Sequence, residues 1–101
     1  MMELSVLDRL VLLNVIPREG DITTLKIVRK LNDELSFSEE EHKQLLFRNE
    51  GDSLHWNEIP PKEVEIGEKA TDVIVEAFKK LNKQGKLHMD YLDLYERFVK
   101  E

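Results

Sequence analysis

Residues 38–56, SEEEHKQLLFRNEGDSLHW, contain the point at which the hydrophobic pattern changes from a helical period to a strand period. Ser38 and the three glutamates after it fit a capping box, in which a serine accepts from a free backbone amide and an acid three residues later reaches back. Acidic side chains in a first helical turn are also favoured by the helix dipole. A short helix is therefore predicted with Ser38 as its cap, ending at about Lys43 or Leu45.

Two short strands are predicted after this helix. Leu45 alternates with Phe47, and Leu54 alternates with Trp56, which is the period of a strand with one buried face. With Glu50-Gly51 at the centre of the turn, Phe47 faces Leu54 and Leu45 faces Trp56, so both apolar pairs lie on one side and set the register. Trp56 then belongs to the core. If the other face of the sheet packs instead, Trp56 becomes an exposed binding anchor.

The residues before this region predict two helices. A capping box at Ser5 begins a segment that is apolar on nearly every face as far as Ile16, as in a central core helix. Pro17 ends that helix, because the proline ring disfavours helical geometry in the residue before it. Asp21 or Thr23 caps a second helix, which carries a single apolar stripe over residues 22–35.

The residues after it predict one strand and two helices. Residues 63–66 alternate charged and apolar side chains, so a third strand with charged outer positions is expected. Residues 70–81 give the most regular helical pattern in the chain, and Gly85 stops that helix as a left-handed cap. A last helix begins at His88, Met89 or Asp90.

Together these elements predict a single α+β domain over residues 1–101, with about five helices and a three-stranded antiparallel meander. The order helix, helix, short helix, hairpin is also the layout of a winged helix-turn-helix. In that reading, residues 38–43 form the recognition helix and residues 49–52 form the wing tip. Base readout needs Arg, Lys, Asn or Gln side chains, whereas these two elements present mainly acids.

The net charge of −6 is concentrated in the middle of the chain. Residues 33–72 hold twelve acids and four bases, for −8, and the segments on either side are each +1. A negative field repels phosphate, so a protein partner with a basic surface is expected rather than a nucleic acid. The alternative is that these acids only keep the domain soluble. The candidate interaction residues are Glu39, Glu40, Glu41, Glu63 and Glu65.

No motif points to catalysis, a cofactor or a metal. The chain has no cysteine, which excludes thiolate zinc sites and cysteine nucleophiles. His42, His55 and His88 lack the spacing of metal ligands, and nothing like a nucleophile elbow precedes Ser53. The four glycines form no phosphate-binding loop. The sequence therefore predicts a protein that is not an enzyme and needs no cofactor.

A cytoplasmic location is expected. No apolar segment approaches the ~20 residues needed to cross a bilayer. The start, Met1-Met2-Glu3, lacks the basic stretch of a secretory signal.

Three stretches carry a resemblance to known proteins: VLDRL at residues 6–10, IGEKAT at 66–71 and LDLYERF at 92–98. They resemble the small uncharacterised proteins of about this length found in tailed-phage and prophage genomes, and the resemblance spans most of the chain. It implies a phage or bacterial accessory protein acting in the cytoplasm. It implies no activity and no site residue.

The leading hypothesis is a non-enzymatic protein-interaction or assembly module. The second is a winged-helix regulator that binds DNA through the bases outside the centre, namely Arg18, Lys26, Arg29, Lys30, Lys79, Lys80 and Lys83. The third is an acidic mimic of DNA. A homodimer is also predicted, because the first helix has apolar residues on more faces than one packing contact needs.

Overall fold

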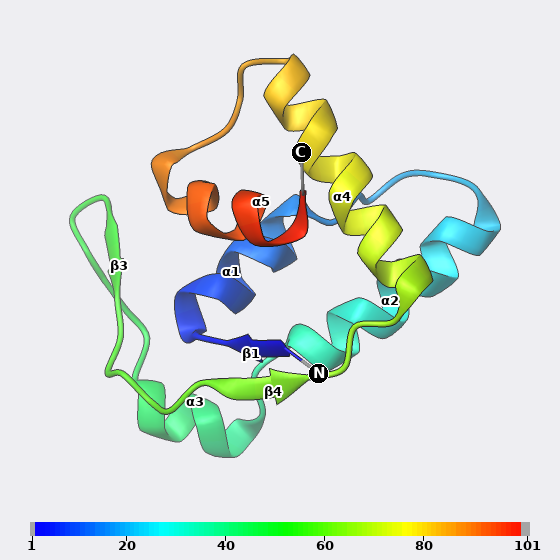
Figure 1. The fold of residues 1–101 in the computed structure, drawn as a ribbon. Helices are drawn as coiled ribbons and strands as arrows, with labels where there is room; N and C mark the ends of the chain where they lie inside the picture. The colour runs from blue at the N-terminus through cyan, green and yellow to red at the C-terminus, as the bar shows by residue number, and fades with distance from the viewer. Residues whose placement is uncertain (1, 100–101) are drawn as a thin grey trace.

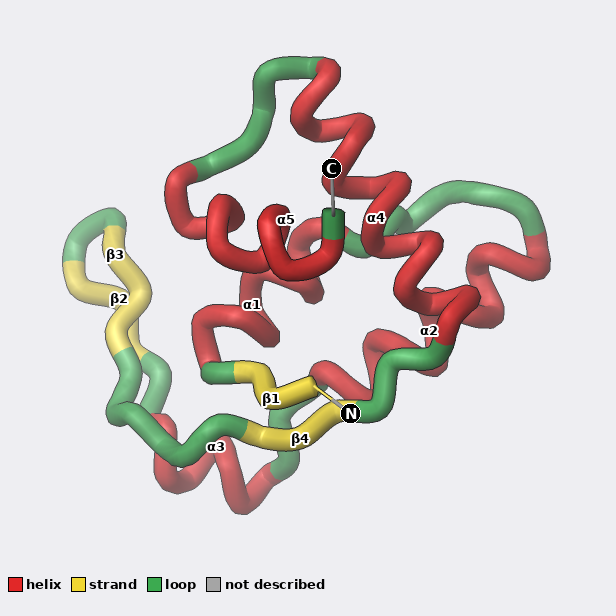
Figure 2. Tube along the Cα trace, in the orientation of Figure 1, coloured by secondary structure: helices red, strands yellow, loops and turns green. Residues whose placement is uncertain are grey.

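The structure is a computed structural model that describes residues 2–99, and Figure 1 shows how its helices and strands are arranged. The described residues form an α+β fold with five α-helices, one 3-10 helix and two separate two-stranded antiparallel sheets (Figure 2). In chain order the elements are β1 (Met2–Leu4), α1 (Val6–Val15), α2 (Ile22–Leu35), α3 (Glu39–Leu45), β2 (Arg48–Glu50), β3 (Ser53–His55), β4 (Lys62–Val64), α4 (Glu68–Lys83), η1 (Met89–Tyr91) and α5 (Leu92–Phe98).

The predicted helix boundaries are confirmed where a side chain or a glycine marks them. Both capping boxes form, at Ser5 with Asp8 and at Ser38 with Glu41. Asp21 is the N-cap of α2 and accepts a hydrogen bond from the backbone amide of Thr24. Gly85 follows the end of α4 with a φ of 67°, the left-handed geometry that a glycine adopts without strain.

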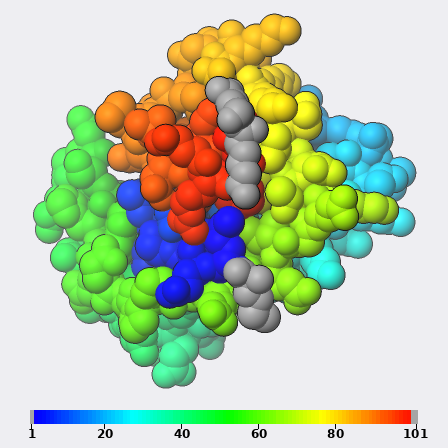
Figure 3. Space-filling view, viewed as in Figure 1, coloured from blue at the N-terminus to red at the C-terminus, as the bar shows by residue number. Residues whose placement is uncertain are grey.

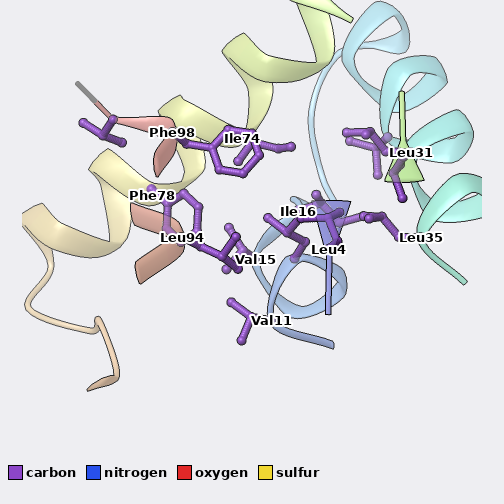
Figure 4. Packing of buried hydrophobic residues seen from close by; sticks show 14 residues of the cluster. Leu4, Val11, Val15, Ile16, Leu31, Leu35, Ile74, Phe78, Leu94 and Phe98 are labelled. Atoms are coloured by element: carbon purple, nitrogen blue, oxygen red, sulfur yellow. The ribbon is translucent and has the colours of Figure 1, made fainter. Parts of the chain in front are cut away.

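The core lies between α1, α2, α4 and α5 (Figure 4). Leu12 of α1 and Phe78 of α4 are fully buried, and the Phe78 ring lies 5.8 Å from that of Tyr95 and 6.3 Å from that of Phe98. Of the apolar residues of α1, only Leu7 is exposed. The other elements of the chain therefore cover most of α1, and the apolar surplus that suggested a homodimer through this helix is not present.

The prediction of a three-stranded meander is wrong, because the described strands form two separate two-stranded sheets. The third strand forms at Lys62–Val64, but it pairs with β1 at the start of the chain rather than with the hairpin. Leu4 and Val64 of this β1–β4 ribbon are buried in the core. The burial of Leu4 and Val64 explains the pairing. When β1 and β4 pair in this register, both apolar side chains reach the helical core.

The β2–β3 hairpin forms after α3, as the winged-helix layout predicted, but in a different register. Asn49 pairs with Leu54 and Glu50 pairs with Ser53, so Gly51 and Asp52 occupy the centre of the turn. Gly51 has a φ of 64°, and glycine is preferred at this first central position in a type II′ turn. The predicted turn would have placed Glu50 there, where its Cβ disfavours a positive φ. Within the described residues neither hairpin strand pairs with a third strand.

Candidate functional site

A buried arginine joins the helical core to α3. Arg9 is only 1% exposed, and it is the one charged residue among the described ones that is buried. Its guanidinium donates to both carboxylate oxygens of Glu41, through Nη1 at 3.3 Å and through a short contact from Nη2. It also lies 4.1 Å above the ring of Phe37, a favourable cation–π geometry. Arg9 of α1 and Glu41 of α3 are 32 positions apart in the chain, and the contact between them holds the two helices together.

Among the described residues, Glu41 is the one whose carboxylate accepts hydrogen bonds from the buried guanidinium of Arg9 and balances its charge. The buried Nε atom of Arg9 finds no hydrogen-bond partner there. The side chain of Glu41 is 19% exposed, and hydrogen bonds from Arg9 hold the pKa of its carboxyl at about 2, below the usual 4.5. Partial burial opposes this shift, while the Ser38 amide and the charges of Arg9 and Lys62 add to it. Glu41 is therefore a structural anion rather than a free contact residue.

Acid is expected to weaken the fold through this pair. Because the pKa of Glu41 is lower in the folded chain than in the unfolded chain, its contribution is complete above about pH 4.5 and is lost as the pH falls toward 2. The loss is on the order of 3 kcal/mol. Urea unfolding of the wild type and of Glu41→Gln between pH 7 and pH 2 measures it. The two free energies of unfolding should converge as the pH falls, and a gap that stays constant would contradict the pairing.

The Phe37 ring that contacts Arg9 belongs to a cluster of four aromatic side chains. Phe37, His42, Phe47 and Trp56 form a chain of edge-to-face neighbours with ring centroids 5.4 to 6.1 Å apart. Trp56 is half-buried, and its indole nitrogen donates to Glu58 at 3.0 Å. The prediction that Trp56 joins the core is wrong, because neither Trp56 nor the aromatic residues in contact with it belong to the cluster of buried residues that the large helices share.

The first two candidate glutamates lie at the exposed start of α3. Glu39 and Glu40 are exposed, and neither forms an ion pair with another described residue. The neighbouring Glu41 points inward, so the pair with Arg9 fixes the rotation of α3 and leaves the other two carboxylates in solvent. At the hairpin, the carboxylate of Glu50 lies 3.7 Å from the guanidinium of Arg48 and 3.6 Å from Nε2 of His55.

The other two candidates, Glu63 and Glu65, lie on or next to the β1–β4 ribbon. Glu63 is directly opposite Glu3 in the ladder, and both are exposed. Like charges directly opposite each other destabilise a strand pair. Glu65 is exposed just beyond β4 and lines a hollow of about 500 Å³ with Lys30, Glu34 and Lys69 among others. Sequence reasoning missed Glu3, because nothing at the start of the chain showed which strand it would meet.

Residues 2–99 contain three histidines, and each lies in a different part of the structure. No group of three or more His, Asp or Glu side chains in that range is placed to hold a metal ion. His42 belongs to the aromatic cluster, His55 lies near Glu50 and His88 packs beside Tyr91. No helix in the same range has the length and apolar composition that a membrane span requires.

The basic residues named for DNA binding are exposed but lie away from α3 and the hairpin. Lys26, Arg29 and Lys30 are on α2, and the lysines of α4 are near its C-terminal end. The short helix and the wing tip that a winged helix would present to DNA instead carry Glu39, Glu40 and Asp52.

No protein-family model matches the chain, and no match to it was found among curated proteins or solved structures.

Proposed function

We propose that the chain is a non-enzymatic protein-interaction or assembly module whose exposed carboxylates contact a basic surface of another protein. The contact consists of Glu39 and Glu40 at the start of α3 together with Glu63 and Glu65 at the ribbon. Glu41, although named with them from the sequence, has the separate task of holding α3 in place through Arg9.

The observation that carries this proposal is the arrangement of Glu3 and Glu63. Two exposed carboxylates face each other across the ribbon, and such a pair costs stability in the isolated chain. A basic partner would remove that repulsion, so the pair favours binding in a way that dispersed solubilising charges do not. Lys62, the residue before Glu63 in β4, donates from its Nζ to the backbone oxygen of Glu34 at 3.5 Å and forms no ion pair with Glu3 or Glu63.

The resemblance to small proteins of tailed-phage and prophage genomes supports a bacterial cell as the place to look for the partner. Charge complementarity at such a surface mainly sets the association rate and the choice of partner. The interaction is therefore expected to weaken as salt is added, because exposed charges are screened beyond a Debye length of about 10 Å at 0.1 M.

A pull-down from bacterial lysate tests the proposal. The wild-type chain should retain a partner in about 0.05 M NaCl and lose it in about 0.5 M, where the Debye length is several times shorter. Glu39→Lys/Glu40→Lys should recover at least about tenfold less of that partner, a loss of roughly 1.4 kcal/mol. The matched control is Glu19→Lys/Glu96→Lys, which makes the same charge change at two exposed acids elsewhere.

Recovery of no partner, or of one that is indifferent to the reversal at Glu39 and Glu40, would count against the proposal. A gel shift with genomic DNA fragments at low salt separates it from the winged-helix hypothesis. The acidic α3 and wing tip predict no shift, and a shift abolished by Lys→Glu changes on α2 and α4 would favour the DNA-binding alternative.

A further inference from the structure

An aromatic side chain and a carboxylate lie side by side just after the β2–β3 hairpin. The indole Nε1 of Trp56 donates to Oε1 of Glu58 at 3.0 Å, so the two side chains hold each other in place. Trp56 is half-buried and Glu58 is exposed. Figure 3 shows the green atoms of this segment along one side of the molecule. Glu58 forms no ion pair with any described residue, and its second oxygen, Oε2, accepts no hydrogen bond from one.

The arginine of the hairpin itself lies on the other face. Side chains alternate between the two faces of paired strands, so Trp56 shares a face with Leu54 and with Phe47, whose ring lies 6.1 Å from the indole. Leu54 is 42% exposed. Arg48 belongs to the opposite face, where it forms an ion pair with Glu50. An aromatic ring and an exposed leucine therefore share one face, next to a carboxylate that the hairpin's own arginine does not neutralise.

The same two groups, a ring and a carboxylate, already bind an arginine inside this chain. The guanidinium of Arg9 lies 4.1 Å from the centre of the Phe37 ring and donates to both carboxylate oxygens of Glu41. A guanidinium suits this arrangement because its planar face stacks on a ring while its N–H groups reach a carboxylate. Trp56 and Glu58 present the same two groups at the surface, and tryptophan gives the strongest cation–π contact of the aromatic residues.

We infer that Trp56 and Glu58 form a docking site for an arginine side chain of the basic partner. The inference rests on the proposed function for the existence of that partner, and it specifies a side chain that the partner contributes. The guanidinium stacks on the indole and donates to Oε2 of Glu58, while Leu54 contacts an apolar part of the same partner. The net charge of −8 over residues 33–72 favours an occupant of this sign, and tryptophan and arginine are the residues most often found to dominate binding energy at interfaces.

The site can be observed directly, because Trp56 is the single tryptophan of the chain. In the isotope-labelled full chain, the one indole N–H signal in the nuclear magnetic resonance spectrum therefore belongs to Trp56. Titration with the peptide acetyl-Ala-Arg-Ala-amide should shift this signal until it saturates. The lysine counterpart, at the same ionic strength, should bind at least about threefold more weakly, because an ammonium group lacks the planar face.

Two substitutions test the carboxylate. Glu58→Gln removes the charge but keeps an oxygen that can accept from the indole, and it should weaken binding of the arginine peptide at least about threefold. Glu19→Gln is the matched control, at an exposed acid in the connection from α1 to α2, which lies on the opposite side of the molecule in Figure 3. Equal shifts with the two peptides, no shift at all, or an unchanged affinity in Glu58→Gln overturns the inference.

The titration needs no partner protein, so its outcome is separate from that of the pull-down. A partner retained through Glu39 and Glu40, together with a chain that binds no arginine peptide, overturns the arginine site and leaves the proposed function standing. Binding of the peptide without recovery of a partner supports the site and counts against the proposed function. Where both succeed, Glu58→Gln should recover at least about threefold less of the partner, and unchanged recovery contradicts the inference.

Discussion

Glu41→Gln is expected to lower the free energy of unfolding by about 3–5 kcal/mol at pH 7, the usual effect of removing one partner from a buried ion pair. The effect is large because Arg9 is 1% exposed and has no other carboxylate within reach among the described residues. Its charge cannot be hydrated without opening the contact between α1 and α3. Chemical denaturation with urea, followed by circular dichroism, gives the value.

The neighbouring residue provides the control. Glu40→Gln makes the same chemical change one position earlier in the same helical turn, at an exposed side chain. It should change stability by no more than about 0.5 kcal/mol. If the two substitutions were equally mild, the inward position of Glu41 would be contradicted.

Phe78→Ala is expected to cost about 3–5 kcal/mol, through lost apolar burial and the cavity that remains. Phe78 is fully buried, and its ring packs against Tyr95 and Phe98 where α4 meets α5. Domains of this kind are stable by about 5–15 kcal/mol in total, so the variant should melt some tens of degrees below the wild type. Differential scanning calorimetry measures the midpoint.

Met89→Ala is the comparison for Phe78→Ala. Met89 is also a large apolar residue near the same end of the chain, but it is 83% exposed at the start of η1. Its truncation should cost about 0.5 kcal/mol or less. A Phe78 variant with a midpoint close to that of the Met89 variant would show that α4 and α5 do not share this core.

Local signals were enough to locate the helices, because each depends on residues close together in the chain. Ser5, Ser38, Asp21 and Gly85 act through backbone groups within a turn of their own position. Strand pairing depends instead on distant partners. Met2–Leu4 has no pattern beyond three residues, and its partner Lys62–Val64 lies about sixty positions away, so the ribbon could not be predicted.

The functional residues divide in the same way. The exposure of Glu39 and Glu40 could be expected from the amphipathic pattern of a short helix. The inward turn of Glu41 could not, because it depends on an arginine 32 residues earlier. A signal for Arg9 was present, since a charge in a helix that is apolar on nearly every face must be buried and paired. The pattern does not indicate which acidic residue pairs with Arg9.

The outward position of Glu39 and Glu40 depends on the Arg9–Glu41 pair, which holds α3 against α1. A double-mutant cycle with Arg9→Met and Glu41→Gln tests it directly. We expect the double variant to be more stable than the sum of the single losses predicts, with a coupling energy of about 2 kcal/mol. Losses that simply add, to within about 0.5 kcal/mol, would show that the two side chains do not act as a pair and would contradict the account.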